Sequence, residues 1–190
     1  MSLAHPFLKT MKKILLYLFV LLISLPTYGK KIENMFVMRN TTAGMLYFIK
    51  ENKFTTQDEA YTSLKVDITY LERDSIASLK MSIFGEEVKA IDSIQIAWAD
   101  SKDVCQSVRI MYKDIKKKNK WENRCDCTFS YTSVRDAFTS ETSPMIVLYS
   151  KNTSTTFIMN NNQWKSIYNN LNRIFYMIDV NNEITTGNNN

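Results

Sequence analysis

The stretch that decides the fold reads Leu-Lys-Val-Asp-Ile-Thr-Tyr at residues 64–70. Apolar and polar residues alternate along all of it, from Leu64 to Tyr70. Because successive side chains of a β-strand point to opposite faces, this period of two predicts a strand that buries one face.

Further strands are predicted on both sides of this stretch. The same period of two marks residues 77–83, 94–98, 104–112, 125–131 and 155–159. Two continuous apolar runs, 45–49 and 145–149, are typical of strands buried on both faces. Short polar connections separate these roughly eight strands, which favours antiparallel neighbours. We therefore predict a mainly β (α+β) fold, either an antiparallel sandwich or a partly closed barrel.

One C-terminal amphipathic helix is predicted in addition. Apolar residues recur there every three or four positions, namely at Trp164, Ile167, Tyr168, Leu171, Ile174, Phe175 and Ile178. That spacing places them on one helical face, which packs against the sheet or plugs an open barrel end. The longest connection, residues 133–144, has room for a helical turn around Val134, Ala137 and Phe138.

The first 29 residues have the layout of a secretory signal. Lys12 and Lys13 precede an apolar stretch, residues 14–25, which is shorter than the roughly 20 residues that span a membrane. Small residues follow at positions 27 and 29, before a plausible cleavage site. We predict a cleavable signal over 1–29, with Met11 as a candidate true start and an uncleaved anchor as the alternative. The protein is then expected to be secreted or periplasmic.

The remaining chain has the length of one domain. We expect a loose segment over 30–40, a single β-rich domain over 41–180 and a disordered tail over 181–190. The two ends are rich in asparagine and lack the alternation of the middle.

Composition argues against several function classes. The one histidine, His5, leaves with the signal, so histidine-activated nucleophiles and histidine metal sites are excluded from the exported part. The four glycines form neither a G-x-G-x-x-G nor a Walker loop, and no cofactor is expected. Loss of three leader lysines leaves 21 basic against 19 acidic residues, and the formal charge falls from +5 to +2. Nucleic acid is therefore not an expected partner.

Three cysteines form the sharpest local pattern. If residues 104–112 and 124–131 make a hairpin, its register brings Cys105 nearest Cys127. An exported chain favours oxidation, so we predict a Cys105–Cys127 disulfide, with Cys125 free and buried. A soft-metal or redox site, and a Cys125 that exchanges with the bridge or links two chains, are the alternatives.

A basic turn supplies the candidate contact residues Lys116, Lys117, Lys118, Lys120 and Trp121. These lysines could contact phosphates or acidic envelope sugars, whereas the alternative is that they keep an exposed turn soluble.

Two acidic pairs are candidates for general acid/base chemistry. Glu86 and Glu87 fall on one predicted turn, and Asp100 and Asp103 on another. Acids are common on turns for solvation alone, so no catalytic residue and no metal ligand is assigned.

Two tripeptides, Asp74-Ser75-Ile76 and Asp92-Ser93-Ile94, resemble the acceptor of the general O-glycosylation system of Bacteroidetes envelopes. This resemblance implies modification of Ser75 and Ser93 in a periplasmic or surface protein. The alternative is that Asp and Ser open a strand after a turn.

The leading functional expectation is a secreted or periplasmic, non-enzymatic β-rich domain that binds a protein or an envelope glycan. Missing catalytic groups and surplus aromatics, such as Trp98, Trp121, Tyr61 and Tyr112, favour it. The alternatives are a carboxylate-dependent glycan hydrolase and a β-barrel carrier of a small apolar ligand. We expect a monomer that meets a membrane only through an uncleaved signal.

Overall fold

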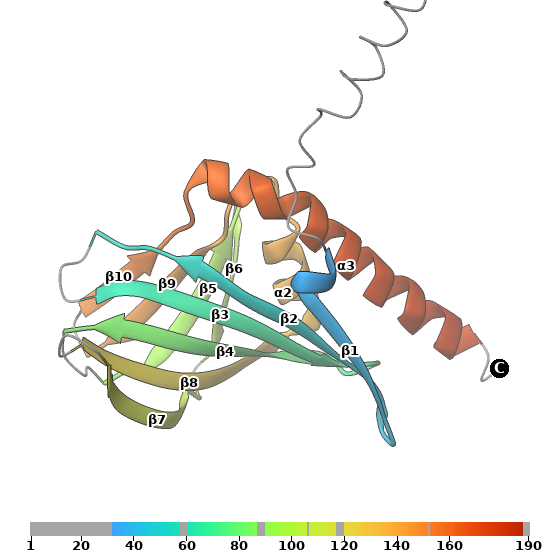
Figure 1. Ribbon diagram of the computed structural model, residues 1–190, viewed down its shortest axis with the longest axis horizontal. Helices are drawn as coiled ribbons and strands as arrows, with labels where there is room; N and C mark the ends of the chain where they lie inside the picture. Colours follow the sequence, from blue (N-terminus) through green and yellow to red (C-terminus); the bar gives the residue numbers. More distant parts are fainter. Residues whose placement is uncertain are drawn as a thin grey trace, which may run out of the picture.

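Two antiparallel sheets packed together form a β-sandwich with a C-terminal helix beside them (Figure 1). The computed structural model describes residues 32–57, 61–86, 90–105, 107–116, 120–151 and 153–187. The predicted signal over 1–29 lies outside these residues. The sandwich alternative is confirmed, and the sheets are not closed into a barrel.

The larger sheet has six strands. Their order is β1 (Phe36–Thr41), β2 (Gly44–Phe54), β3 (Tyr61–Leu71), β4 (Ile76–Gly85), β8 (Lys120–Ser130) and β7 (Arg109–Lys116). The four strands of the smaller sheet run in the order β10 (Thr153–Phe157), β9 (Met145–Ser150), β5 (Ser93–Trp98) and β6 (Ser101–Cys105). An isolated antiparallel bridge between Thr55 and Ile158 joins the two sheets at one corner.

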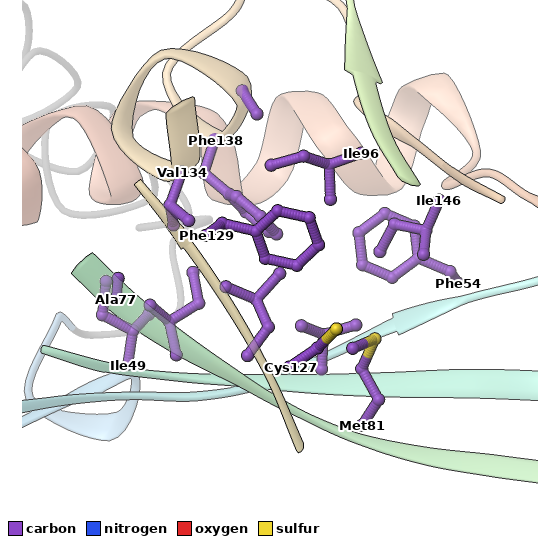
Figure 2. Close-up of a cluster of buried hydrophobic side chains, with 14 of the residues drawn as sticks. Ile49, Phe54, Ala77, Met81, Ile96, Cys127, Phe129, Val134, Phe138 and Ile146 are labelled. Atoms are coloured by element: carbon purple, nitrogen blue, oxygen red, sulfur yellow. The ribbon is translucent and has the colours of Figure 1, made fainter. Parts of the chain in front are cut away.

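The core lies between the sheets, where the predicted alternation is realised. Register places Leu64 opposite Ile83, Val66 opposite Met81 and Ile68 opposite Leu79, all on the inward face. Figure 2 shows part of this cluster, in which side chains from both sheets and from α2 meet. Burying each such aliphatic side chain stabilises the fold by about 1.5–3 kcal/mol relative to leaving it exposed.

Two helices complete the core. The short helix α2 (Tyr131–Phe138) contacts α3, β4, β5 and β8. Its first turn is capped by Ser130, whose Oγ accepts a hydrogen bond from the Ser133 amide at 2.9 Å. The helical turn expected around Val134 is thus a full helix, and Tyr131 opens it rather than extending the strand. The long helix α3 (Asn161–Gly187) crosses the top of the view in Figure 1 and buries the predicted apolar stripe, apart from half-buried Tyr168.

The segment expected to be loose, residues 30–40, contains instead a short 3-10 helix η1 (Ile32–Asn34) and most of β1. Strand β1 pairs with β2 from Phe36 opposite Ile49 to Thr41 opposite Gly44. Most β1 side chains are exposed, so backbone pairing rather than a buried face orders the strand. Such a strand leaves no period of two in the sequence.

The expected disordered tail over 181–190 is corrected for residues 181–187, because α3 continues to Gly187; residues 188–190 lie outside the described residues. Asn181 donates to the Tyr47 hydroxyl at 3.2 Å, and Asn182 donates to the Tyr70 hydroxyl at 3.0 Å. Thr185 donates to Glu72 at 2.8 Å. These polar contacts dock the end of the helix on β2 and β3, where an apolar pattern is missing.

We expect Leu171→Ala to lower the free energy of unfolding by about 2–5 kcal/mol, because it opens a cavity under α3. Leu171 is fully buried, whereas Tyr176 on the same helix is 72% exposed. The matched variant Tyr176→Ala should therefore change stability by no more than about 0.5 kcal/mol. Urea unfolding of both variants measures this, and equal losses would contradict the packing described for α3.

Candidate functional site

A disulfide ties the two sheets together. Cys105 at the end of β6 is bonded to Cys127 in β8, with the Cα atoms 6.2 Å apart. The predicted pairing is confirmed, but the expected single strand over 104–112 is divided between the two sheets. Only Val104 and Cys105 lie in β6, while residues 109–112 lie in β7, which pairs with β8 and places Ile110 opposite Cys125. Loop closure gives a bridge of this separation a stabilisation of about 3 kcal/mol, and the bond is compatible with an extracellular or periplasmic location.

The third thiol, Cys125, is free and buried, as predicted. Burial raises the pKa of the Cys125 thiol to about 12, so it is protonated at neutral pH. Cys127 is already bonded, and no cluster of three metal-ligating side chains occurs in the described part of the chain.

We predict that iodoacetamide leaves native Cys125 unmodified over the time in which it labels a denatured control fully, because only the exposed thiolate reacts. Cys105 and Cys127 should be labelled only after reduction. Mass mapping of unreduced protein tests both statements. Rapid native labelling of Cys125, or its recovery in intermolecular dimers, would refute the buried assignment.

The outward face of the six-stranded sheet carries a network of charged side chains. Arg124 forms an ion pair with Asp67 and donates to Ser82 Oγ at 2.7 Å. Asp126, in the same strand β8, is paired with Arg109 of β7 and accepts a hydrogen bond from Ser78. The polar layer therefore joins β3, β4, β8 and β7 on a face that faces away from the core.

Glu122 is, with Asp126, one of the two buried acids of this network. It accepts a hydrogen bond from the Tyr112 hydroxyl at 3.1 Å and lies 3.0 Å from Lys116 Nζ. Burial alone would raise the pKa of Glu122, but hydrogen bonds from Ser82, Lys116 and Tyr112 outweigh it, and the pKa is lowered. Glu122 is therefore ionised at neutral pH.

A lowered pKa makes Glu122 a source of acid sensitivity. Its contribution to stability is fully present above its unfolded pKa, near 4.5, and is lost as the pH falls through the lower pKa of the folded state. We expect the free energy of unfolding of Glu122→Gln to fall less steeply below that pH than that of the unchanged protein. Urea titrations over the acid range measure this, and parallel pH profiles would contradict it.

A hollow of about 400 Å³ opens on this same outward face. We call it the basic hollow, and its lining consists of Lys53, Thr62, Ser63, Lys65, Phe84, Lys116 and Lys120. Four lysines thus surround one aromatic ring. Lys65 Nζ lies 5.8 Å from the centre of the Phe84 ring, within the range of a cation–π contact.

The register of the strands sets these lysines against one another. Lys53 of β2 lies opposite Lys65 of β3, and Lys116 of β7 lies opposite Lys120 of β8. Like charges in directly opposite positions are destabilising. The hollow contains two such pairs of positively charged residues in opposite positions. Because this arrangement does not favour stability, it indicates another role.

Acidic neighbours relieve this repulsion only in part. Lys65 is 2.8 Å from Glu51, and Lys116 is 2.8 Å from Asp114 in addition to its pair with Glu122. Hydrogen bonds with Asp114 and Glu122 raise the pKa of Lys116 above its usual range. Within the described ranges, no acidic side chain forms an ion pair with Lys53 or Lys120. Both remain available to an external anion.

We predict that Lys53→Gln raises the free energy of unfolding by about 0.2–1 kcal/mol, because it removes a like-charge cross-strand pair. Lys80 supplies the matched control, since it lies on the same face opposite Asp67 and Asp126. Lys80→Gln should therefore lower stability. A loss of stability in Lys53→Gln equal to that in Lys80→Gln would show that Lys53 has a favourable partner.

The candidate contact residues of the basic turn separate in the structure. Lys116 and Lys120 line the basic hollow, while Lys117 and Lys118 lie outside the described residues. Half-buried Trp121 does not line the hollow, because it follows Lys120 in an extended strand and points to the opposite face.

Five of the lining residues were not predicted from the sequence, namely Lys53, Thr62, Ser63, Lys65 and Phe84. A signal for Phe84 was present, since it falls on the outward phase of an alternation whose inward phase holds Met81 and Ile83. An aromatic residue on the phase that normally carries polar residues indicates a contact surface.

The acidic residues of the two candidate pairs differ in their surroundings. Glu86 and Asp100 are exposed, Glu87 lies outside the described residues, and Asp103 accepts a hydrogen bond from the amide of Val104 at 2.8 Å.

The buried acids Glu122 and Asp126 do not form a catalytic pair. They are four residues apart on β8 and hence roughly 13 Å apart in an extended strand, too far for the two carboxyls of a glycosidase. Each is paired with a cation, Lys116 or Arg109.

The two serines of the glycosylation resemblance differ in exposure. Ser75 is exposed in the turn between β3 and β4, whereas Ser93 is half-buried as the first residue of β5. Their modification stays a prediction.

A further hollow, of about 490 Å³, lies near the bridge between Thr55 and Ile158. Its lining is uncharged, namely Thr55, Thr56, Gln57, Ser154, Thr155, Thr156 and Ile158.

Comparisons with protein-family models, with curated proteins and with solved structures find no match to this chain. Among the described residues, no helix has both the length and the apolar character required to cross a membrane.

Proposed function

We propose that this protein is an exported, non-enzymatic binding module that holds an acidic glycan of the cell envelope in its basic hollow. The observation that carries the proposal is the strand register, which sets Lys53 opposite Lys65 and Lys116 opposite Lys120 in a hollow that Phe84 also lines. An anion bound there adds an acidic partner for Lys53 and Lys120, which form no ion pair within the described ranges. The signal predicted over residues 1–29 and the disulfide between the sheets would both fit an envelope location.

The chemistry of the hollow favours an acidic sugar over a neutral one. Ammonium groups form charge-assisted hydrogen bonds with carboxylate or phosphate, and the half-buried ring of Phe84 offers an aromatic surface beside Lys65 to the apolar face of a sugar ring. Lys53 and Lys120 supply the charge that internal ion pairs do not use.

Binding of polygalacturonate, a carboxylated polysaccharide, at low salt tests the proposal, with dextran as the neutral control. We expect polygalacturonate to bind with an affinity that falls as salt rises, and dextran not to bind. The double variant Lys53→Gln/Lys120→Gln should weaken binding by about tenfold or more. The matched variant Lys102→Gln/Lys151→Gln removes the same charge from the region of the smaller sheet and should bind as the unchanged protein does.

Two results would overturn this function. Equal weakening by both double variants would mean that net charge, not the basic hollow, attracts the polymer. Release of new reducing ends during incubation would show a hydrolase.

A further inference from the structure

The lysines of the basic hollow and Phe84 form an oblique row that crosses five strands. Phe84 lies two residues beyond Ser82, the partner of Lys65, and Lys120 lies two residues beyond Glu122, the partner of Phe84. In the order of the sheet, Lys53 lies on β2, Lys65 on β3, Phe84 on β4, Lys120 on β8 and Lys116 on β7. These strands follow one another across the larger sheet in Figure 1. The row therefore has a lysine pair at each end and an aromatic ring between them.

The length of this row exceeds one sugar ring. Four inter-strand spacings separate β2 from β7, which amounts to roughly 19 Å at 4.8 Å each. One compact anion cannot sit on both lysine pairs at once with its charges close to each. Acidic groups spaced along a chain can.

A second hollow continues the row beyond β2. It measures about 270 Å³ and its lining is Glu51, Asn52, Lys53, Lys65, Met159, Gln163, Ser166 and Ile167. It shares Lys53 and Lys65 with the basic hollow, so the two hollows adjoin across these side chains. The start of α3 supplies uncharged hydrogen-bonding groups there, the Gln163 amide and the Ser166 hydroxyl.

We infer that the ligand is a linear acidic glycan that runs obliquely across the strands, from the start of α3 to the adjoining ends of β7 and β8 at Lys116 and Lys120. Acidic groups occupy the two lysine pairs, one sugar ring lies on Phe84 between them, and neutral hydroxyls meet Gln163 and Ser166. This inference rests on the proposed function and specifies its ligand as a chain rather than a single acidic sugar.

Calorimetric titration with galacturonate oligomers of increasing length tests whether the ligand is a linear glycan. We expect the hexamer to bind at least about tenfold more tightly than the monomer, because only a chain reaches both lysine pairs. Inositol hexaphosphate, a compact anion of high charge, and maltohexaose, a neutral chain, should both bind more weakly than the hexamer.

Variants at either end of the row provide the second measurement. Lys53→Gln/Lys65→Gln and Lys116→Gln/Lys120→Gln should each weaken hexamer binding by about tenfold while leaving monomer binding within about threefold. Phe84→Leu should weaken the hexamer but not hexaglutamate, which has no sugar ring to place on it. Melting temperatures of all three variants show whether any loss of binding reflects unfolding.

The outcomes separate the two levels of the inference. If no galacturonate oligomer binds, the proposed function fails. If monomer and hexamer bind equally, or inositol hexaphosphate binds as tightly as the hexamer, the hollow is an anion site but its ligand is not a linear glycan. If hexaglutamate binds more tightly than the hexamer, the ligand is an acidic peptide and the glycan assignment is wrong.

Discussion

The four-stranded sheet is too narrow to cover the inward face of the six-stranded sheet, and the rest of the structure depends on how the uncovered part is buried. The inward face of the larger sheet must be buried, yet the opposing sheet is narrower by two strands. Helices α2 and α3 supply the missing cover. Tyr131 of α2 stacks on Tyr70 with ring centres 4.0 Å apart and also contacts Phe175 of α3. The aromatic side chains thus fill the space that a wider second sheet would have filled.

The outward face is free of this burial requirement and can carry a different chemistry. Its charged groups are arranged in register with the strands, so that neighbouring strands hold each side chain in a fixed row. Opposite charges meet where Lys80 lies beside Asp67 and Asp126, whereas equal charges meet at Lys53 and Lys65. One face therefore contains both a stabilising arrangement, around Lys80, and a destabilising one, at Lys53 and Lys65. The destabilising arrangement is the basis of the affinity for acidic glycans that we propose. A protein retains such a conflict when activity depends on it.

Elements with one buried face were predictable from the sequence, and elements without one were not. The alternation over 64–70 and 77–83 predicts β3 and β4, and the apolar stripe from Trp164 to Ile178 predicts α3. Strand β1 and the end of α3 were missed because hydrogen bonds order them rather than an apolar face. The basic hollow was predictable only in part, through Lys116 and Lys120, which are close in sequence. Lys53, Lys65 and Phe84 meet them only through strand pairing between β2, β3, β4 and β8, which a local pattern does not report.

Strand β7 has a consequence for the motions of the molecule. It is an edge strand whose eight residues are all exposed, and β8 is its partner. Ion pairs on one face and the nearby Cys105–Cys127 bond hold it, with little apolar burial, so its opening costs less free energy than global unfolding. Ile110 of this strand lies opposite Cys125 in the neighbouring strand β8. The rate at which that thiol is labelled in the native state would therefore report how often β7 separates from β8. Salt, which weakens the ion pairs of β7, would raise this rate, and a bound acidic ligand would lower it.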